Sequence, residues 1–188
     1  DAGVIVAGGM ESMSRAPHLL TDLRTGRRFG DDSLIDSMSR DGLFCAVEQW
    51  PMGAAADYIA AKFGVTRAAQ DELALSSHQL AVAAQDAGFF HDEIVAVAVK
   101  SSTIAVDEGP RREASLATIA ALKPAFDPAG TGTAGNASQI SDGAACVLVV
   151  DEARAREIAS PIKARIVASA VHGVAPKDLF IAPVGAIQ

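Results

Sequence analysis

Uninterrupted runs of apolar residues occur at several places along the chain, and they predict strands. Residues 4–7 read VIVA and are followed by two glycines. A run without polar alternation suits a strand that is buried on both faces, which favours a parallel or mixed sheet. The runs at residues 94–99, 146–150 and 162–171 are rich in β-branched residues. They predict three further strands.

Two helices are predicted one after the other. Residues 52–63 have helical composition and end at Gly64, the residue type expected just past a helix. Thr66 is an N-cap candidate for a longer helix that stops at Gly88. Helical spacing on this second helix predicts an inward face and a face toward water. The inward residues are Leu73, Ser77, Leu80 and Ala84, and the outward ones are Asp71, Gln79 and Gln85.

Two shorter helices and one irregular region complete the pattern. Ser115 is placed to cap a helix that Pro124 ends, and Asp151 to cap one that runs through Ile158. Residues 10–51 show no sustained period, and loops of that length are usually functional or packed on a partner. The predicted order is strand, long α-rich insertion, strand, helix, strand.

Composition fits a soluble globular chain, because 49% of the 188 residues are apolar, 21% charged and 5% aromatic. The two cysteines, Cys45 and Cys146, lie far apart and suggest a reducing compartment rather than a disulfide framework. The net charge of −7 argues against a nucleic-acid binder. Every apolar run is shorter than the ~18–20 residues that cross a bilayer, so we expect a cytoplasmic protein without membrane insertion.

The two ends of the sequence suggest a piece of a longer protein. The first residue is Asp1, and strand-like residues begin already at Val4. The sequence closes on IAPVGAIQ without a further element. We therefore expect an internal fragment.

A glycine-rich stretch near the middle matches the dinucleotide fingerprint in its letters. Gly130, Gly132 and Gly135 form GxGxxG, but two prolines precede them where that motif needs a strand. Two interpretations stay open: a turn-rich connector, or a wall where backbone approaches a ligand closely. Asn136-Ala-Ser138 is also a glycosylation sequon, which we interpret as accidental without a secretory signal.

Histidines are the first candidates for acid–base chemistry. His78 falls on the long predicted helix, where a surface or structural role is the usual one, and His91 falls in a polar turn. His18 and His172 fall in loops, and no orienting partner can be named for them. No residues have the spacing of a metal site.

The cysteines and one arginine pair give weaker evidence for a functional site. Cys146 lies in an apolar strand, which predicts a buried, inert thiol, and Cys45 lies in the irregular region. Arg111 and Arg112 suit a phosphate, but such a pair is more often plain surface charge.

Four segments carry a family resemblance that covers nearly the whole chain. They are VIVAGGMESMSRAPHLL (residues 4–20), Met52-Gly53, LKPAFD (residues 122–127) and TAGNASQISDGAA (residues 133–145). In this order and spacing they resemble the thiolase family. The resemblance implies an α/β chain with an αβαβα layered fold, here incomplete, and an α-rich coenzyme-binding insertion. Residues 1–9 and 127–160 would belong to the N-terminal half, residues 10–126 to the insertion, and residues 161–188 to the start of the C-terminal half.

The family exchanges acyl groups between coenzyme A and a catalytic cysteine. The motifs that carry its catalytic cysteines, asparagine and histidine do not occur in this sequence. We therefore assign no catalytic residue and expect the isolated chain to be inactive. The resemblance further implies coenzyme A as a substrate rather than a permanent cofactor, acyl-CoA as a second ligand, and a homodimer or homotetramer.

Seven positions resemble the family's coenzyme A and acyl contacts. By position in matching motifs, they are Ser138, Ala134, Phe126, Thr118, Arg111, Met52 and Leu179. Ser138, Ala134 and Phe126 would line the pantetheine arm, Thr118 and Arg111 the adenine and phosphate end, and Met52 and Leu179 the acyl pocket. Arg24, Arg27 and Arg28 fall where thiolases have an assembly loop, although surface charge explains them equally well.

Gln139 after Ser138 resembles degradative 3-oxoacyl-CoA thiolases more than acetoacetyl-specific members. The leading hypothesis is therefore part of a degradative thiolase. The alternatives are an acetyl-CoA C-acetyltransferase and a non-catalytic protein that binds acyl-CoA.

Overall fold

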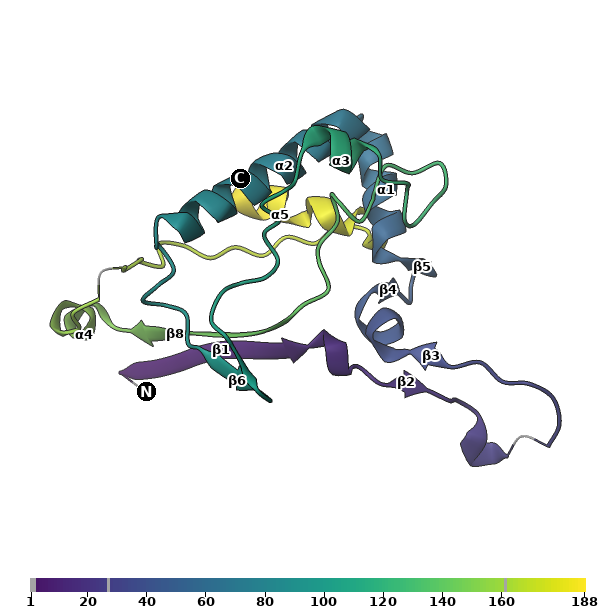
Figure 1. Cartoon of the computed structure of the whole chain (residues 1–188), viewed down its shortest axis with the longest axis horizontal. Helices are drawn as coiled ribbons and strands as arrows, with labels where there is room; N and C mark the ends of the chain where they lie inside the picture. The colour runs from purple at the N-terminus through teal and green to yellow at the C-terminus, as the bar shows by residue number, and fades with distance from the viewer. Residues whose placement is uncertain (1–2, 27, 161) are drawn as a thin grey trace. The chain divides into compact units, whose positions relative to one another are not determined.

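A computed structural model describes residues 3–26, 28–160 and 162–188 (Figure 1). The chain divides into two units: residues 1–42 with 140–188 form the first, and residues 43–139 form the second. None of the described helices is both long and apolar enough to span a bilayer. How the two units correspond to the halves and the insertion of a thiolase stays a prediction.

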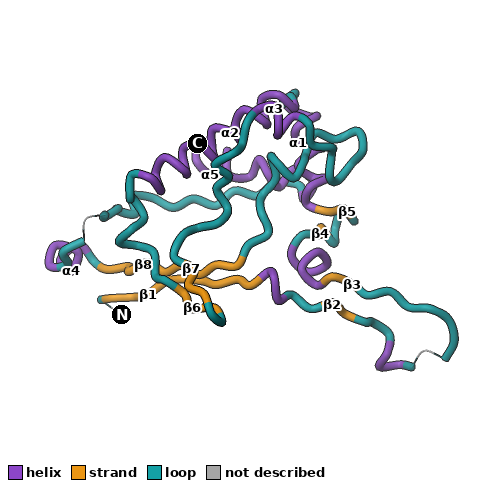
Figure 2. The backbone as a smooth tube through the Cα atoms, in the orientation of Figure 1, coloured by secondary structure: helices purple, strands orange, loops and turns teal. Residues whose placement is uncertain are grey.

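The first unit is built on one long strand pair. Strand β1 (Val4–Ser12) runs antiparallel to β8 (Asp142–Val150), with Val4 opposite Val150 and Ser12 opposite Asp142. Figure 2 shows the two strands side by side in orange. The strands predicted at residues 4–7 and 146–150 are confirmed, but the parallel or mixed sheet is wrong, since every described pairing is antiparallel. Burial on both faces is wrong too. Val6 is 70% exposed, because within the described residues no layer covers it.

Short elements fill the irregular region, which was expected to be a long loop. They are η1 (Met13–Arg15), β2 (His18–Leu19), η2 (Leu23–Thr25), β3 (Ile35–Asp36) and η3 (Met38–Gly42). Strands β2 and β3 pair as an antiparallel hairpin. Arg24 lies in η2 and Arg28 in the exposed loop beyond it, whereas Arg27 falls outside the described residues.

The C-terminal part of the first unit contains one confirmed helix and one wrong strand. Helix α4 (Glu152–Glu157) follows Asp151, whose carboxylate accepts the Arg154 N–H at 2.8 Å as the cap prediction required. The strand expected over residues 162–171 does not form. Its described residues have no ladder partner, and a strand needs a neighbour as well as β-branched side chains. η4 (Pro176–Ile181) and α5 (Ala182–Ile187) follow.

The second unit contains the predicted helices, with the predicted caps. After β4 (Phe44–Cys45) and β5 (Trp50–Pro51), α1 (Met52–Phe63) ends at Gly64, whose φ of +66° suits a residue without Cβ. Helix α2 (Arg67–Asp86) starts at Thr66, whose hydroxyl accepts the Ala69 N–H at 3.2 Å. Helix α3 (Leu116–Ala120) starts at a capping box formed by Ser115 and Thr118.

The predicted face of α2 is wrong at most of its positions, although Ala84 is half-buried and Gln79 exposed as predicted. Leu73 and Leu80 are 72% and 69% exposed, whereas Asp71, expected toward water, is only 3% exposed. The half-buried residues of this helix include Ala74, Leu75, His78, Ala81 and Val82. An ion pair with Arg67 makes burial of the Asp71 carboxylate possible, and this partner cannot be read from apolar spacing.

Only part of the expected strand at residues 94–99 is present. Strand β6 (Val97–Val99) pairs with β7 (Ser102–Ile104) in a short antiparallel hairpin. The turn contains Lys100 in a left-handed conformation, with φ of +53°. The second strand of this hairpin was not predicted.

Side chains with little solvent contact gather in the second unit. Ala55 on α1, Asp71 on α2, Ile119 on α3 and Thr133 in the following loop are the buried residues of the described chain. Figure 1 shows α3 lying along α2. The buried contacts of this unit therefore join three helices and the loop that carries Phe126, Ala134 and Ser138.

Candidate functional site

Six of the seven predicted contact residues lie in the second unit, and Leu179 lies in η4 of the first. Leu179 and Met52 are half-buried, and the other five are exposed. The position of Leu179 relative to the other six stays a prediction. The contacts below show which of those six the fold brings together.

Phe126 lies against the start of α1, at the residue that follows Met52. The Phe126 ring lies against Gly53, so closely that a Cβ on Gly53 would overlap the ring. Met52 precedes Gly53, and its N–H donates to the Leu43 carbonyl at 2.8 Å. The ring stays 42% exposed, so it offers an apolar surface beside the first turn of α1.

The loop at the GxGxxG motif is held by a carboxylate of the same unit. The N–H groups of Thr131 and Gly132 both donate to Asp57 Oδ1, at 2.8 Å and 2.7 Å. A Cβ on Gly130 would overlap the Asp57 carboxylate. Close approach was one of the two open interpretations of these glycines, and in the structure the group approached is Asp57. Backbone donors that already bind a carboxylate are not free for a pyrophosphate, which agrees with rejecting the dinucleotide interpretation.

A second carboxylate, the buried one of Asp71, holds the next part of the loop. Asp71 pairs with Arg67 at 2.8 Å and accepts a hydrogen bond from Asn136 Nδ2 at 3.0 Å. The same Nδ2 donates to the Thr131 carbonyl at 3.1 Å, while Asn136 Oδ1 accepts the Thr133 N–H at 2.7 Å. Asn136 thereby joins both ends of a tight turn to α2.

Ala134 and Ser138 are presented outward by this turn. Gly135 between them packs on α3 and the residues after it, because a Cβ there would lie 2.7 Å from Leu122 Cδ1 and 3.1 Å from Ile119 Cγ2. The inner side of the loop is therefore packed on the unit, and Ala134 and Ser138 lie on its exposed side.

Thr118 and Arg111 lie on segments that border the same loop. The Thr118 hydroxyl is engaged in the cap of α3, since it accepts the Ser115 N–H at 3.0 Å and donates to the Ser115 carbonyl at 2.9 Å. Gln139, next to Ser138, reaches Gly109, where a Cβ would overlap its amide. Gly109 lies two residues before Arg111, so the arginine-bearing segment borders the segment that carries Ser138.

His78 has a structural role, as its helical position predicted. Its Nδ1 accepts the N–H of Arg111 at 3.2 Å. Arg112, the next residue, pairs with Asp86 at 2.8 Å on the exposed side of α2. These two contacts attach the arginine pair to α2 and leave the Arg111 side chain exposed.

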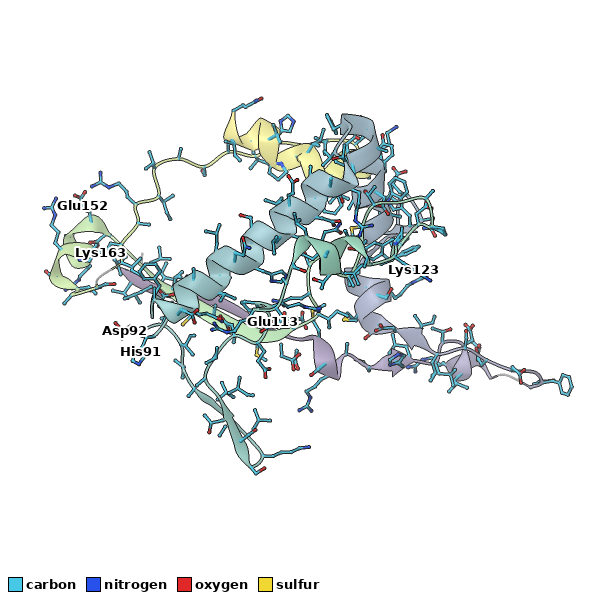
Figure 3. The ribbon with its side chains drawn as sticks, turned by 45° about the horizontal axis from the view of Figure 1, so that its top comes forward. His91, Asp92, Glu113, Lys123, Glu152 and Lys163 are labelled. Carbon is cyan, nitrogen blue, oxygen red and sulfur yellow. The ribbon has the colours of Figure 1, made fainter. Side chains whose placement is uncertain are left out.

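The other acid–base candidates are not gathered into a site. His91 and its neighbour Asp92 are each 88% exposed and lie after the end of α2 (Figure 3). His18 is exposed in β2, and the His172 ring lies beside Gly185. Among the described residues, no three His, Cys, Asp or Glu side chains are grouped as a metal would need.

The thiols differ from expectation in burial. Cys146 lies in β8 as predicted, but it is exposed, so the buried thiol is wrong. The strand is covered by no further layer in the described residues, and an apolar sequence alone does not bury it. Cys45 is half-buried in β4, and its sulfur accepts the Glu48 N–H at 3.4 Å.

One carboxylate in the first unit has a perturbed titration. Asp142 accepts the Ser14 N–H at 2.9 Å and the Ser14 hydroxyl at 2.5 Å. These hydrogen bonds lower the pKa of Asp142, because they stabilise its charged form. The contact ties the end of β1 to the start of β8.

A family model described as "Thiolase, N-terminal domain" matches residues 1–153. The chain belongs to the thiolase family. Its curated relatives include a probable acetyl-CoA acetyltransferase of Escherichia coli K12, 48% identical over all of this chain and 49% of the relative. The acetyl-CoA acetyltransferase of Cupriavidus necator is 47% identical over 99% of this chain and 49% of the relative. The chain thus spans about half the length of the curated relatives it matches.

Solved thiolases have the same fold over nearly all of this chain. Human mitochondrial 3-ketoacyl-CoA thiolase in complex with CoA superposes with a TM-score of 0.88 at 39% identity, covering 98% of this chain and 47% of that one. Acetyl-CoA acetyltransferase from Syntrophomonas wolfei gives a TM-score of 0.87 at 41% identity, covering 98% and 47%. The α/β thiolase fold expected from the sequence motifs is confirmed.

The residues that hold the predicted site were missed by sequence analysis. Asp57, Arg67 and Asp71 were not candidates, and Asn136 was considered only as part of a small-residue wall or a sequon. The one available signal was the spacing of Arg67 and Asp71, which are opposite charges four residues apart on a helix. That spacing indicates an ion pair but says nothing of its burial.

Proposed function

We propose that the protein containing this chain is an acyl-CoA C-acyltransferase that cleaves 3-oxoacyl-CoA with coenzyme A. The products are acetyl-CoA and an acyl-CoA that is shorter by the acetyl unit. This chain contributes the surface that binds the coenzyme A part of the substrates. The match of residues 1–153 to the thiolase N-terminal domain carries this proposal.

The arrangement of the second unit suits that ligand. Ala134 and Ser138 present a small-residue surface, and the exposed Phe126 ring adds an apolar one. The Arg111 segment borders Ser138 through Gln139 and Gly109, so a cation is available for phosphate groups. A narrow surface of small residues with one cationic end matches a thin pantetheine arm that ends in phosphates.

Chemistry at the acyl group is assigned to no residue of this chain. Coenzyme A is a substrate in this proposal rather than a resident cofactor. The role of Leu179 and Met52 is to contact the acyl end, where their apolar side chains suit a carbon chain.

The preferred substrate is a 3-oxoacyl-CoA of degradative metabolism, as Gln139 suggests. A second candidate, acetyl-CoA C-acetyltransferase activity on acetoacetyl-CoA, is favoured by the names of the relatives in Escherichia coli and Cupriavidus necator. Comparing kcat/KM for acetoacetyl-CoA with kcat/KM for longer 3-oxoacyl-CoA substrates distinguishes the two. A higher value for the longer substrates supports the degradative assignment, and a higher value for acetoacetyl-CoA overturns it.

The non-catalytic alternative is tested by the same kinetic assay together with a coenzyme A binding measurement. A protein that binds coenzyme A but releases no acetyl-CoA from any 3-oxoacyl-CoA would be a binding protein.

We also propose a homodimer or homotetramer in the cytoplasm, on the thiolase resemblance. Light scattering tests the oligomer, and cell fractionation tests the location.

A further inference from the structure

The Arg67–Asp71–Asn136 cluster contains a buried carboxylate, that of Asp71, which apolar packing alone would not require. Asp71 is 3% exposed and carries a carboxylate, while the apolar buried side chains of the described chain are only Ala55 and Ile119. A buried carboxylate is costly unless it is paired and hydrogen-bonded. Both conditions are met here, by Arg67 and by Asn136.

Arg67 extends the cluster to α3. Its Nη2 donates to three carbonyls at the end of that helix, those of Ile119 at 3.0 Å, Ala120 at 3.3 Å and Leu122 at 3.0 Å. Cations are favourable at helix C-termini, where carbonyls lack intrahelical partners. One guanidinium thus joins α2 to the end of the helix that carries Thr118.

Asn136 extends the cluster in the other direction, to the loop. Its amide makes three hydrogen bonds: one with Asp71 and two with backbone groups of Thr131 and Thr133. The Thr133 side chain is fully buried, and its hydroxyl accepts the Gly135 N–H at 3.1 Å. The turn that carries Ala134 is therefore held by contacts on its buried side.

We propose that Arg67, Asp71 and Asn136 form a hydrogen-bond network, called the relay below, that positions loop 130–138 and the end of α3 for binding coenzyme A. The three residues do not contact the coenzyme. They set the distance between the loop that carries Ala134 and Ser138 and the helix that carries Thr118. This inference rests on the proposed function, since it names the residues that shape its binding surface.

Asp71→Asn tests the relay in the protein that contains this chain. An amide cannot accept from Arg67 and Asn136 as a carboxylate does, so the relay is weakened at its centre. We expect the Kd for coenzyme A to rise about tenfold, which corresponds to about 1.4 kcal/mol. We expect kcat at saturating coenzyme A to stay within about twofold, because the relay does not contact the reacting atoms.

Glu72→Gln is the matched control. Glu72 is the next residue on α2 and is exposed, so the same change from carboxylate to amide leaves the relay intact. Its Kd for coenzyme A is expected to equal that of the wild type. A rise equal to that of Asp71→Asn would overturn the proposal.

Asn136→Ala separates positioning from overall stability. This variant keeps the Arg67–Asp71 pair and removes the hydrogen bonds of Asn136 to Asp71, Thr131 and Thr133, so it serves where Asp71→Asn does not fold. Hydrogen exchange of residues 130–138 is expected to quicken in it while exchange in α2 stays unchanged. A double-mutant cycle with Ser138→Ala on the Kd for coenzyme A should be non-additive, because both variants act through one loop. Additive effects, or a changed melting temperature with unchanged Kd, would overturn the relay.

The outcomes also separate this inference from the proposed function. If the wild type binds no coenzyme A by calorimetry, the proposed function fails and the relay fails with it. If the wild type binds and Asp71→Asn binds equally well, only the relay fails.

Discussion

Phe126 rests its ring on Gly53, where a Cβ would overlap the ring. We expect Gly53→Ala to push the ring away from α1 and to lower the free energy of unfolding by roughly 1–3 kcal/mol, the usual cost of overpacking. The Kd for coenzyme A should rise as well, because Phe126 is a proposed contact. Gly42→Ala is the control, since a Cβ there meets nothing within 4 Å. Chemical denaturation of both variants gives the comparison, and equal stability would contradict the contact.

Asp57 accepts two backbone N–H groups of the glycine-rich loop. Asp57→Ala leaves both donors without this acceptor, so we expect a loss of roughly 1–3 kcal/mol in the free energy of unfolding. Asp57→Asn keeps a carbonyl oxygen in the same place and should lose less. Asp92→Ala removes a carboxylate that is 88% exposed and should change nothing measurable. A larger loss for Asp57→Asn than for Asp57→Ala would refute this assignment.

The Ser14–Asp142 contact predicts a pH dependence. Because the pKa of Asp142 is lowered in the folded chain, its contribution to stability is present above the ordinary aspartate pKa of ~3.9 and is lost as pH falls through the lowered pKa. Ser14→Ala removes the hydroxyl donor and should raise the pKa of Asp142 toward the ordinary value. Melting temperatures of wild type and variant should differ at neutral pH and converge in acid. NMR titration of the Asp142 carboxyl carbon measures the shift directly, and Ser33→Ala should leave it unchanged.

A bulky residue at position 138 should block the proposed pantetheine surface. We expect Ser138→Trp to raise the Kd for coenzyme A by at least about tenfold, because the indole fills a surface shaped for small residues. Ser101→Trp, in the turn of the β6–β7 hairpin, is the control. Calorimetry measures the Kd for coenzyme A in both variants. Unchanged affinity in Ser138→Trp would place the coenzyme elsewhere.

The chain of 188 residues should release no acetyl-CoA by itself. No catalytic residue is assigned to it, so it offers a binding surface without a nucleophile placed for the reaction. The measurement is acetyl-CoA release from a 3-oxoacyl-CoA by the purified chain. Turnover above the uncatalysed rate would show that a residue of this chain carries the chemistry.

Local chemistry explains the parts of the fold that could be predicted from the sequence. Thr66, Ser115 and Asp151 cap helices as expected, because a cap depends on a side chain and a backbone N–H a few residues away. The family motifs likewise predicted the fold class. The strand expected over residues 162–171 failed because a strand also depends on a distant partner.

The support beneath the site escaped prediction for a related reason. Polar residues on a helix are normally assigned to water, so Asp71 was assigned to the wrong face. Its burial is explained by Arg67, which is four residues away, and by Asn136, which is distant in sequence. Close backbone approach to a ligand was one of two open interpretations of the glycine-rich stretch, and Asp57 as the neighbour of Gly130 could only be identified from the folded chain.

The two hydrogen bonds from Asn136 Nδ2 have a consequence for modification of this residue. In the Asn136-Ala-Ser138 sequon, that nitrogen is the atom to which a sugar would be attached. It donates its two hydrogens to Asp71 and to the Thr131 carbonyl. An N-linked sugar would replace one of these hydrogens and would have to fit beneath a turn whose Thr133 is fully buried. The observed turn therefore requires an unmodified asparagine.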